Sequence, residues 1–479
     1  MSILKFLQIK KYWPLLLISV IALFLRAYRI DILTTFGRDQ GIDFLVVRDM
    51  IINHKLTLIG IKTSVADFYQ GPNYLYILLP FFWVFNFHPL AGAVSALIVS
   101  ILTIIVLYVL CLKFLNQRVA ILSSILFAVS PEFVKFGNTP LYQHFLPLFI
   151  FLSLFMFFKI QRNPKATNFL WLGFFLGFAL ELHFLAITLV LAILVYLLIF
   201  HRAFKQIINL LLGLIVGLLP TIIFELRHGF LNTNFLYAYL LNRSSGTSIS
   251  PDLNSWLIGA ALFLGANSII IGLVPLARIL FALLTKWNPD YLKRLLIILV
   301  IILVFFNLFV SPFAPHYLLP LWSIAIIVLP LLVSNLKTKI SLGLIFFILL
   351  SNFIATTSQL QQNHGYNMPE GWNLKKILSA AEIVKQDSGG KTGINVASLL
   401  DGDTRTYPLR YTLAYKKVHI DNVEDYPKSN ILYVVALNNP DQVQKSSVWE
   451  IYSFVPFIIT RTWNLGDNIV LYRLDRQNS

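Results

Sequence analysis

Long uninterrupted apolar runs are the feature that most constrains how this chain can fold. Over residues 1–355 they follow one another with only short polar breaks. About 20 consecutive apolar residues cross the hydrocarbon core of a bilayer as one helix, because a helix bonds its backbone polar groups within the segment. The pattern therefore predicts an integral membrane protein with many helices.

We expect about eleven membrane spans, each placed to within a few residues. Only 13% of the residues are charged, too few to cover the surfaces of the soluble domains that 479 residues would otherwise form. The expected spans are 13–27, 89–112, 119–136, 141–159, 168–184, 185–200, 207–225, 256–277, 295–312, 317–334 and 340–355.

The basic residues predict the orientation of the spans. Residues 1–355 hold 25 Lys and Arg against 10 Asp and Glu, and the basic residues punctuate the apolar runs instead of gathering on one face. This distribution fits the positive-inside rule and excludes nucleic acid as a partner. We expect a multi-pass protein of the plasma membrane, with a cytoplasmic amino terminus and an external tail over residues 356–479.

Residues 72–87 form a helix-length apolar run that does not fit this count, because a span there would place the later basic clusters outside. We interpret the run as an interfacial helix on the outer leaflet, where Tyr and Trp rings are favoured. A re-entrant helix is the competing geometry.

The first outer loop, residues 28–71, carries an unusual density of charge. After Gly37 apolar residues recur at helical spacing, so Asp39 and Asp43 are predicted on neighbouring faces of a short helix. Charged groups at a membrane boundary are costly unless they have partners. The loop is therefore either part of a site or a surface helix whose Asp and Arg side chains pair with one another.

Four further outward segments carry polar residues that converge on the same face in this topology. Each residue alone also fits a helix cap or an anchor at the membrane surface. The segments are 130–144, 181–183, 224–230 and 311–317, and their candidate binding residues are Lys135, Asn138, Tyr142, His183, Arg227, His228, His316 and Tyr317.

Four motifs occur in the order in which a known group of enzymes carries them. They are Arg38-Asp39-Gln40, Tyr69-Gln70-Gly71-Pro72, Ser130-Pro131-Glu132-Phe133 and His316-Tyr317-Leu318-Leu319-Pro320. Together they resemble the C-type membrane glycosyltransferases of the protein O-mannosyltransferase and aminoarabinose transferase group.

The resemblance implies a C-type glycosyltransferase fold, a polyprenyl-phosphate sugar as donor, and transfer to an acceptor on the outer face of the membrane. It implies that Asp39 is the essential carboxylate, which accepts the proton of the attacking acceptor hydroxyl. Cationic or donor groups must then hold the leaving phosphate, and Lys135, Arg227, His228 and His316 are the candidates. Arg38, Asp43, Tyr69 and Gln70 complete the expected substrate-binding set.

The chain departs from the pattern of this group at two places. Gln40 follows Asp39 where the group commonly has Glu, so a second carboxylate is either Asp43 or absent. Gln70 and Gly71 stand where relatives often carry Lys or His. The cofactor is unknown: a divalent cation stays open, since isolated carboxylates cannot identify one and no zinc motif is present.

The tail changes to mixed charge with short apolar runs, which predicts a small external α/β domain. Asp401-Gly402-Asp403 is interpreted as a turn before a helix, because the other ligands of a calcium loop are missing. The expected strands are Ile394–Ala397, Ile431–Leu437 and Asn468–Leu474, and the expected helices are 372–386 and 404–416.

These observations favour a cell-envelope glycosyltransferase with a lipid, protein or glycan acceptor. A transporter or flippase of lipid-linked saccharides is the alternative from another class. Secondary transporters often carry internal repeats and charged residues at mid-membrane, and this chain has no detectable repeat and keeps most ionisable groups near the ends of its spans. A polysaccharide polymerase or ligase is a third interpretation.

The predicted orientation can be tested with a reporter fused after Ser479. The reporter is expected to lie outside the cell, because a chain that starts in the cytoplasm and crosses the membrane an odd number of times ends on the outer side. The measurement is the activity of an enzyme that is functional on only one side of the membrane. A cytoplasmic signal would overturn the span count.

Overall fold

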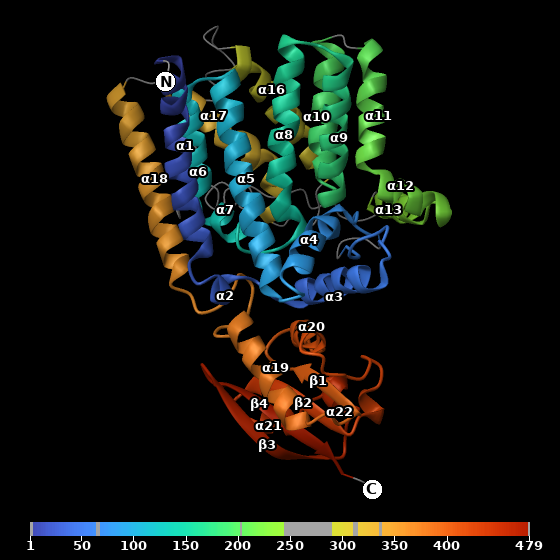
Figure 1. Cartoon of the computed structure of the whole chain (residues 1–479). Helices are drawn as coiled ribbons and strands as arrows, with labels where there is room; N and C mark the ends of the chain where they lie inside the picture. Colours follow the sequence, from blue (N-terminus) through green and yellow to red (C-terminus); the bar gives the residue numbers. More distant parts are fainter. Residues whose placement is uncertain are drawn as a thin grey trace.

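The computed structural model describes residues 3–63, 68–201, 204–243, 290–309, 315–334 and 338–477. It consists of a helical bundle followed by an α/β tail at one end of that bundle (Figure 1). The helices of the bundle are α1 (Ile3–Ala27), α2 (Ile30–Leu33), α3 (Arg38–Asn53), α4 (Asn73–Val84), α5 (Leu90–Phe114), α6 (Gln117–Val129), α7 (Pro131–Phe136), α8 (Tyr142–Arg162), α9 (Ala166–Leu182), α10 (Ala186–Ile199), η1 (Phe204–Gln206), α11 (Ile207–Gly217), α12 (Leu219–Arg227), α13 (Leu231–Arg243), α16 (Asp290–Phe309), η2 (Pro315–Leu318), α17 (Leu319–Ser334) and α18 (Thr338–Leu360).

Two of the expected spans are not single helices. The run 119–136 breaks at Ser130, where Pro131 begins α7, because proline has no N–H to continue the ladder of α6. The run 207–225 bends by 72° between α11 and α12. The expected span 256–277 lies outside the described residues.

The predicted number of spans is not confirmed. Within the described ranges, α5 and α8 are long and apolar enough to cross a membrane. The bent pair 204–217 and 219–227 gives a third span if it is counted as one. Several other apolar helices, α9 and α10 among them, are shorter.

A fully buried arginine joins four helices of the bundle. Arg26 of α1 donates to Ser100 Oγ on α5 (2.7 Å) and to the carbonyls of Phe127 (3.2 Å), Ala128 (2.9 Å) and Phe133 (3.1 Å) on α6 and α7. Arg26 stands near the end of the first expected span, 13–27, and the structure buries it fully inside the bundle. Its partners are neutral oxygens, so hydrogen bonds alone compensate for the burial of this charge.

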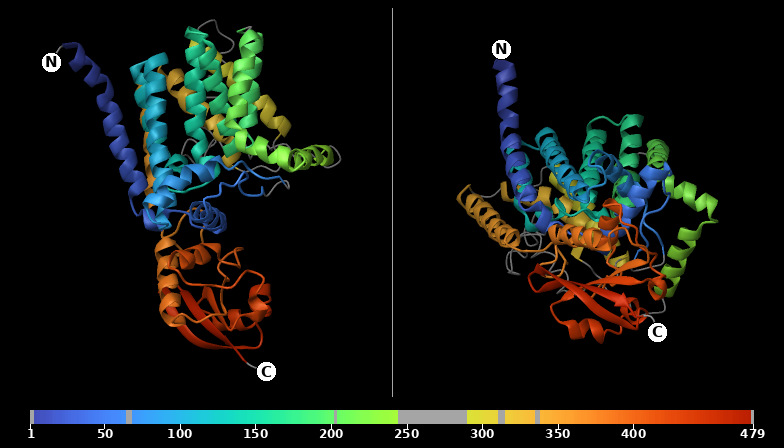
Figure 2. Two further views of the ribbon diagram at one scale, coloured as in Figure 1. Left: turned by 45° about the vertical axis from the view of Figure 1, so that its right-hand side comes forward. Right: turned by 60° about the horizontal axis from the view of Figure 1, so that its bottom comes forward.

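Helices α9 and α11 approach each other through glycines. Gly173 and Gly177 of α9 face Gly213 and Gly217 of α11, and a Cβ at any of the four would collide with backbone of the opposite helix. Small residues spaced by four allow such close contact between membrane helices. This contact places the bend that follows Gly217, and α12 and α13 leave the bundle sideways at that point (Figure 2).

Helices α3 and α4 lie at the end of the bundle that faces the tail (Figure 1). The start of α20 (Tyr407–Tyr415) packs on α3 at Gly41, where a Cβ would come within 2.5 Å of the Tyr407 carbonyl carbon. Tyr411 of α20 makes edge contacts with the rings of Phe36 and Phe44, and its hydroxyl donates to Phe87 O (2.6 Å). The tail is therefore docked on the bundle through an aromatic contact.

The tail is built on a four-stranded sheet in the order β1-β2-β4-β3, in which only the pair β1 and β2 is parallel. The three predicted strands and two predicted helices are confirmed. Strand β3 was missed, because it is an edge strand with no fully buried residue and its apolar residues are interrupted by Thr, Arg and Asn. The elements are α19 (Leu374–Ser388), β1 (Ile394–Ser398), α20, η3 (Tyr426–Lys428), β2 (Ile431–Leu437), α21 (Pro440–Gln444), α22 (Trp449–Tyr452), β3 (Phe457–Gly466) and β4 (Ile469–Arg476).

Replacing Arg26 tests its role in joining the helices. Arg26→Met keeps a long apolar stem but leaves several buried carbonyls without a donor, so we expect a loss of about 3 kcal/mol or more in the free energy of unfolding. The measurement is thermal unfolding in lipid nanodiscs. Arg29→Met is the control, since Arg29 is only half-buried and donates to Leu360 O (3.0 Å). Equal losses in both variants would contradict this role.

Candidate functional site

The first turn of α3 is fixed by Gln40. Its side-chain carbonyl accepts from Gly37 N (2.9 Å), and its amide nitrogen donates to Pro140 O (3.2 Å). A glutamate could accept the first bond but could not donate the second at neutral pH. The departure at this position therefore has a structural reason: Gln40 holds the start of α3 to the segment that precedes α8.

Asp39 lies exposed on the same turn. The protein mass around it raises the pKa of its carboxyl by desolvation, and the neighbouring Arg38 guanidinium offsets part of that rise. A carboxylate in the first turn also interacts favourably with the helix dipole. Asp39 is thus an accessible carboxylate whose pKa is raised, which is the direction that makes a carboxylate a better proton acceptor.

Asp43, one turn later on α3, is buried instead of exposed. Tyr142 donates its hydroxyl to Asp43 Oδ1 (2.6 Å), while Oδ2 has no hydrogen-bond partner among the described residues. Burial raises the pKa of Asp43 well above its usual range, the Tyr142 hydrogen bond opposes the shift, and the charge of Asp39 adds to it. Asp43 therefore faces the protein and not an open surface.

Tyr74 and Tyr142 pack against each other with ring centroids 4.4 Å apart. Both are buried, and Tyr74 is fully so. The sequence predicted Tyr142 as a candidate binding residue. The structure buries its ring against Tyr74 and bonds its hydroxyl to Asp43.

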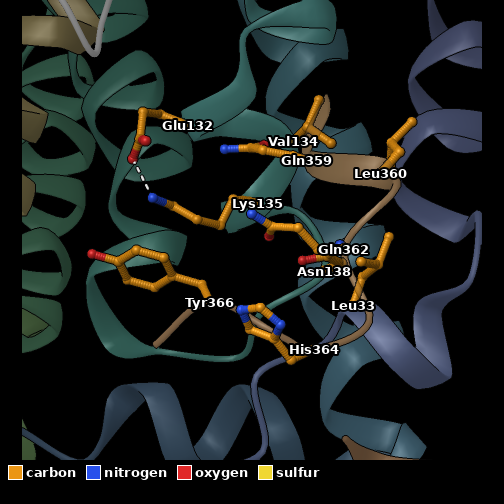
Figure 3. A pocket seen from close by; sticks show the side chains of 10 residues that line it. All are labelled: Leu33, Glu132, Val134, Lys135, Asn138, Gln359, Leu360, Gln362, His364 and Tyr366. Carbon is orange, nitrogen blue, oxygen red and sulfur yellow. Dashed lines mark ion pairs between the residues drawn. The ribbon is translucent and has the colours of Figure 1, made fainter. Parts of the chain in front are cut away.

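Helix α7 presents an ion pair beside a cavity. Lys135 Nζ lies 2.6 Å from Glu132 Oε2 and 3.7 Å from the centroid of the Tyr366 ring. Asn138, just after α7, is buried and lines the same cavity (Figure 3). Lys135 is thus already neutralised by Glu132, which makes it a weaker candidate for binding phosphate.

His183, His316 and Tyr317 come together from the ends of α9 and η2. The imidazole of His183 lies 5.6 Å from that of His316 and 5.7 Å from the Tyr317 ring, centroid to centroid. Burial, with a smaller contribution from the charge of Lys135, lowers the pKa of His316 to about 4. His316 is therefore neutral at pH 7 and can act there as a hydrogen-bond group, not as a cation.

Arg227 and His228 are exposed at the end of α12. Glu225 of the same helix accepts from the amides of Asn232 (3.0 Å) and Thr233 (2.9 Å) and so caps α13. The Asn232 side chain in turn accepts from Tyr69 N (2.6 Å) and donates to Tyr69 O (2.9 Å). Through Glu225 and Asn232 the structure therefore connects two predicted site segments. One contains Tyr69 and Gln70, and the other contains Arg227 and His228.

Glu181 is a buried residue that the predicted site did not include. Its carboxylate packs directly on Gly71, where a Cβ would collide with Glu181 Oε2. A lysine or histidine at position 71 would need this space. The glycine at this position, where relatives often carry Lys or His, is therefore coupled to the presence of Glu181. A charged residue in the last turn of an apolar helix was the signal that could have identified it.

Within the described parts of the chain, no three His, Cys, Asp or Glu side chains gather closely enough to hold a metal ion.

Asp403 connects the tail to this region. It accepts from Tyr407 N (2.8 Å) at the start of α20, which confirms the predicted turn before a helix. The pKa of Asp403 is raised to about 6, mainly by burial and also by the charge of Asp401. The hydrogen bond from Tyr407 N and the charges of Arg38 and Arg410 oppose this rise. The Arg38 of α3 thus lies within electrostatic reach of the tail.

Comparison with known proteins identifies the fold. Residues 69–224 match the family model described as dolichyl-phosphate-mannose-protein mannosyltransferase. ArnT from Cupriavidus metallidurans in the apo state is 13% identical with a TM-score of 0.62 over 96% of this chain and 97% of its own. The structure of the same protein bound to undecaprenyl phosphate has a TM-score of 0.61 at 13% identity, over 96% of this chain and 97% of its own. The Archaeoglobus fulgidus oligosaccharyltransferase tethered to an acceptor peptide gives 0.51 at 13% identity, over 98% of this chain and 74% of its own.

The resemblance found in the sequence, to the C-type membrane glycosyltransferases, is confirmed. At these identities the solved structures establish the shared fold. No curated protein matches the chain by sequence.

The raised pKa of Asp403 predicts how stability depends on pH. The folded state binds the Asp403 proton more tightly than the unfolded state, so this group makes the free energy of unfolding fall as pH rises from about 4 to about 6, by about 3 kcal/mol in total. Asp403→Asn keeps the helix cap and removes the ionisation. We therefore expect the free energy of unfolding of that variant to change less with pH over this range.

The measurement is the unfolding temperature of the protein in nanodiscs between pH 4 and 7. Asp441→Asn, at an exposed carboxylate of α21 paired with Lys445, is the control. If Asp403→Asn followed the wild-type pH profile, the assigned shift would be wrong.

Proposed function

We propose that this protein is a membrane glycosyltransferase that moves a sugar from a polyprenyl phosphate to an acceptor hydroxyl on the outer face of the membrane. The observation that carries the proposal is the accessible carboxylate of Asp39, held on α3 with a raised pKa at the end of the bundle where the tail docks. The fold shared with ArnT, solved with undecaprenyl phosphate, supports a lipid phosphate as the carrier.

In this mechanism Asp39 accepts the proton of the acceptor hydroxyl as its oxygen attacks the anomeric carbon. The bond from that carbon to the phosphate oxygen breaks on the opposite side, and polyprenyl phosphate leaves with the electron pair. The anomeric configuration is therefore inverted. The acceptor oxygen is bound to the sugar, and the proton remains on Asp39 until water removes it.

The leaving phosphate needs a cation that other groups have not neutralised. Lys135 is paired with Glu132, and His316 is neutral at pH 7. Arg227 is exposed at the end of α12, and Glu225 of the same helix is linked to Tyr69 through Asn232. We assign Arg227 to the phosphate, with His228 and Gln70 as hydrogen-bond groups.

The proposal includes the arrangement of the chain in the membrane. Residues 1–355 form the transmembrane glycosyltransferase part, and residues 356–479 form an external domain of a multi-pass plasma-membrane protein. The docking of α20 on α3 supports this division, because the tail must lie on the same side as Asp39. The acceptor is then a lipid, protein or glycan of the cell envelope.

Asp39→Asn tests the mechanism. It removes the proton acceptor with little change of shape, so the rate of transfer is expected to fall by about 10²–10⁴-fold while the protein stays folded. The measurement is the release of polyprenyl phosphate from a panel of polyprenyl-phosphate sugars, with cell-envelope extract as the source of acceptor.

Asp49→Asn is the matched control, since Asp49 is an exposed carboxylate of the same helix that pairs with Asn53. It should retain wild-type transfer. Unchanged turnover in Asp39→Asn would discard the mechanism. Movement of a lipid-linked saccharide across a proteoliposome bilayer without release of polyprenyl phosphate would instead identify a flippase.

A further inference from the structure

A cavity of about 230 Å³ lies where α2, α7 and the end of α18 meet the segment that leads into the tail. Figure 3 shows its lining, with polar side chains from α7 on one side and from residues 359–366 on the other. Pockets for drug-sized ligands usually enclose about 300–1,000 Å³. This cavity is therefore of a size for one small group, about a single sugar ring.

The charges in the cavity cancel. Glu132 and Lys135 form an ion pair within it, and the ammonium group of Lys135 also covers the Tyr366 ring. A site for a phosphate needs an excess of cationic or N–H donors. The cavity offers a balanced pair instead, so it favours a neutral ligand.

The cavity has hydrogen-bonding capacity that the protein does not use. Gln359 is half-buried and Gln362 is exposed at the mouth of the cavity, and neither side-chain amide takes part in the hydrogen bonds found among the described residues. Figure 3 shows both amides directed toward Lys135. Each amide offers both donors and acceptors. His364 adds Nε2, because its Nδ1 is bonded to Asn363 Oδ1 (3.0 Å). Such paired donors and acceptors match the vicinal hydroxyls of a carbohydrate.

Hydrogen bonds join the wall of the cavity to the start of α3. Thr35, four residues before Asp39, donates to Tyr366 O (2.9 Å) and contacts Thr139 Oγ1 (3.3 Å). Gly365 packs on Thr34, where a Cβ would collide with the carbonyl oxygen. The segment 364–366 and the segment that precedes Asp39 are thus held together, so a group bound in the cavity has a fixed relation to α3.

We infer that this cavity binds one neutral sugar residue of a glycan acceptor. The inference rests on the proposed function and names the acceptor class for the same site. The donor sugar carries a phosphate on its anomeric carbon, and a cavity with no excess cation does not suit it. The sugar in the cavity therefore belongs to the acceptor.

Binding can be measured without transfer. The full-length protein in nanodiscs is titrated with methyl α-mannopyranoside, methyl β-glucopyranoside and methyl β-galactopyranoside, and saturation-transfer difference NMR reports contact. At least one glycoside is expected to bind both the wild type and Asp39→Asn. The double variant Gln359→Leu with Gln362→Leu removes two hydrogen-bonding groups and should weaken binding about tenfold or more.

Gln361→Leu is the control, because Gln361 is exposed in the same segment and does not line the cavity. It should bind the glycoside like the wild type. In transfer assays the double variant should raise the KM for a glycan acceptor, while the slow release of polyprenyl phosphate to water stays unchanged.

Three results would overturn the inference: no binding of any glycoside at millimolar concentration, equal weakening by Gln361→Leu, or displacement of the glycoside by inorganic phosphate. Transfer to a peptide with an unchanged KM in the double variant would also overturn it. Glycoside binding that the double variant abolishes, in a protein that never releases polyprenyl phosphate, would preserve the sugar site and reject the proposed function instead.

Discussion

The buried guanidinium of Arg26 is the interaction on which the rest of the bundle depends. It joins α1 to α5, α6 and α7 through oxygens of Ser100, Phe127, Ala128 and Phe133. A charge in this position is tolerated only while its donors are bonded, because an unbonded buried charge costs several kcal/mol, by rough estimate. The break between α6 and α7 exposes the carbonyls of Phe127 and Ala128, which a continuous helix would have bonded, and Arg26 bonds to both.

Helix α3 is held from two sides, and both contacts bear on Asp39. Gln40 ties its first turn to Pro140 in the bundle, and Gly41 lets the tail helix α20 pack directly against it. Tyr411 of α20 also packs edge-on against the rings of Phe36 and Phe44. An exposed carboxylate on a short helix would ordinarily be mobile, whereas here its backbone is fixed by packing. Preorganisation of this kind is what a general base needs.

The two departures from the pattern of the C-type glycosyltransferases are compensated within this chain. Gln40 replaces a carboxylate but gains a hydrogen bond that a carboxylate cannot donate, and Asp43 supplies a second acid that is buried against Tyr142. Gly71 replaces a cation, and the carboxylate of Glu181 occupies the space beside it. Because His316 is neutral at pH 7 and Arg227 is exposed, the proposed mechanism assigns the leaving phosphate to Arg227.

The sequence by itself determined the helical class, the sites of most helices, the strands β1, β2 and β4, and Asp39 on a helix that follows Gly37. Each follows from local periodicity, which a few neighbouring residues express. The burial of Arg26, Asp43 and Tyr74 and the contact of Glu181 with Gly71 were decided by tertiary structure. Whether a polar side chain is exposed or bonded depends on partners a hundred residues away, as with Tyr142 and Asp43. Local patterns carry no record of such partners, so the cavity beside Lys135 emerged only when distant segments packed together.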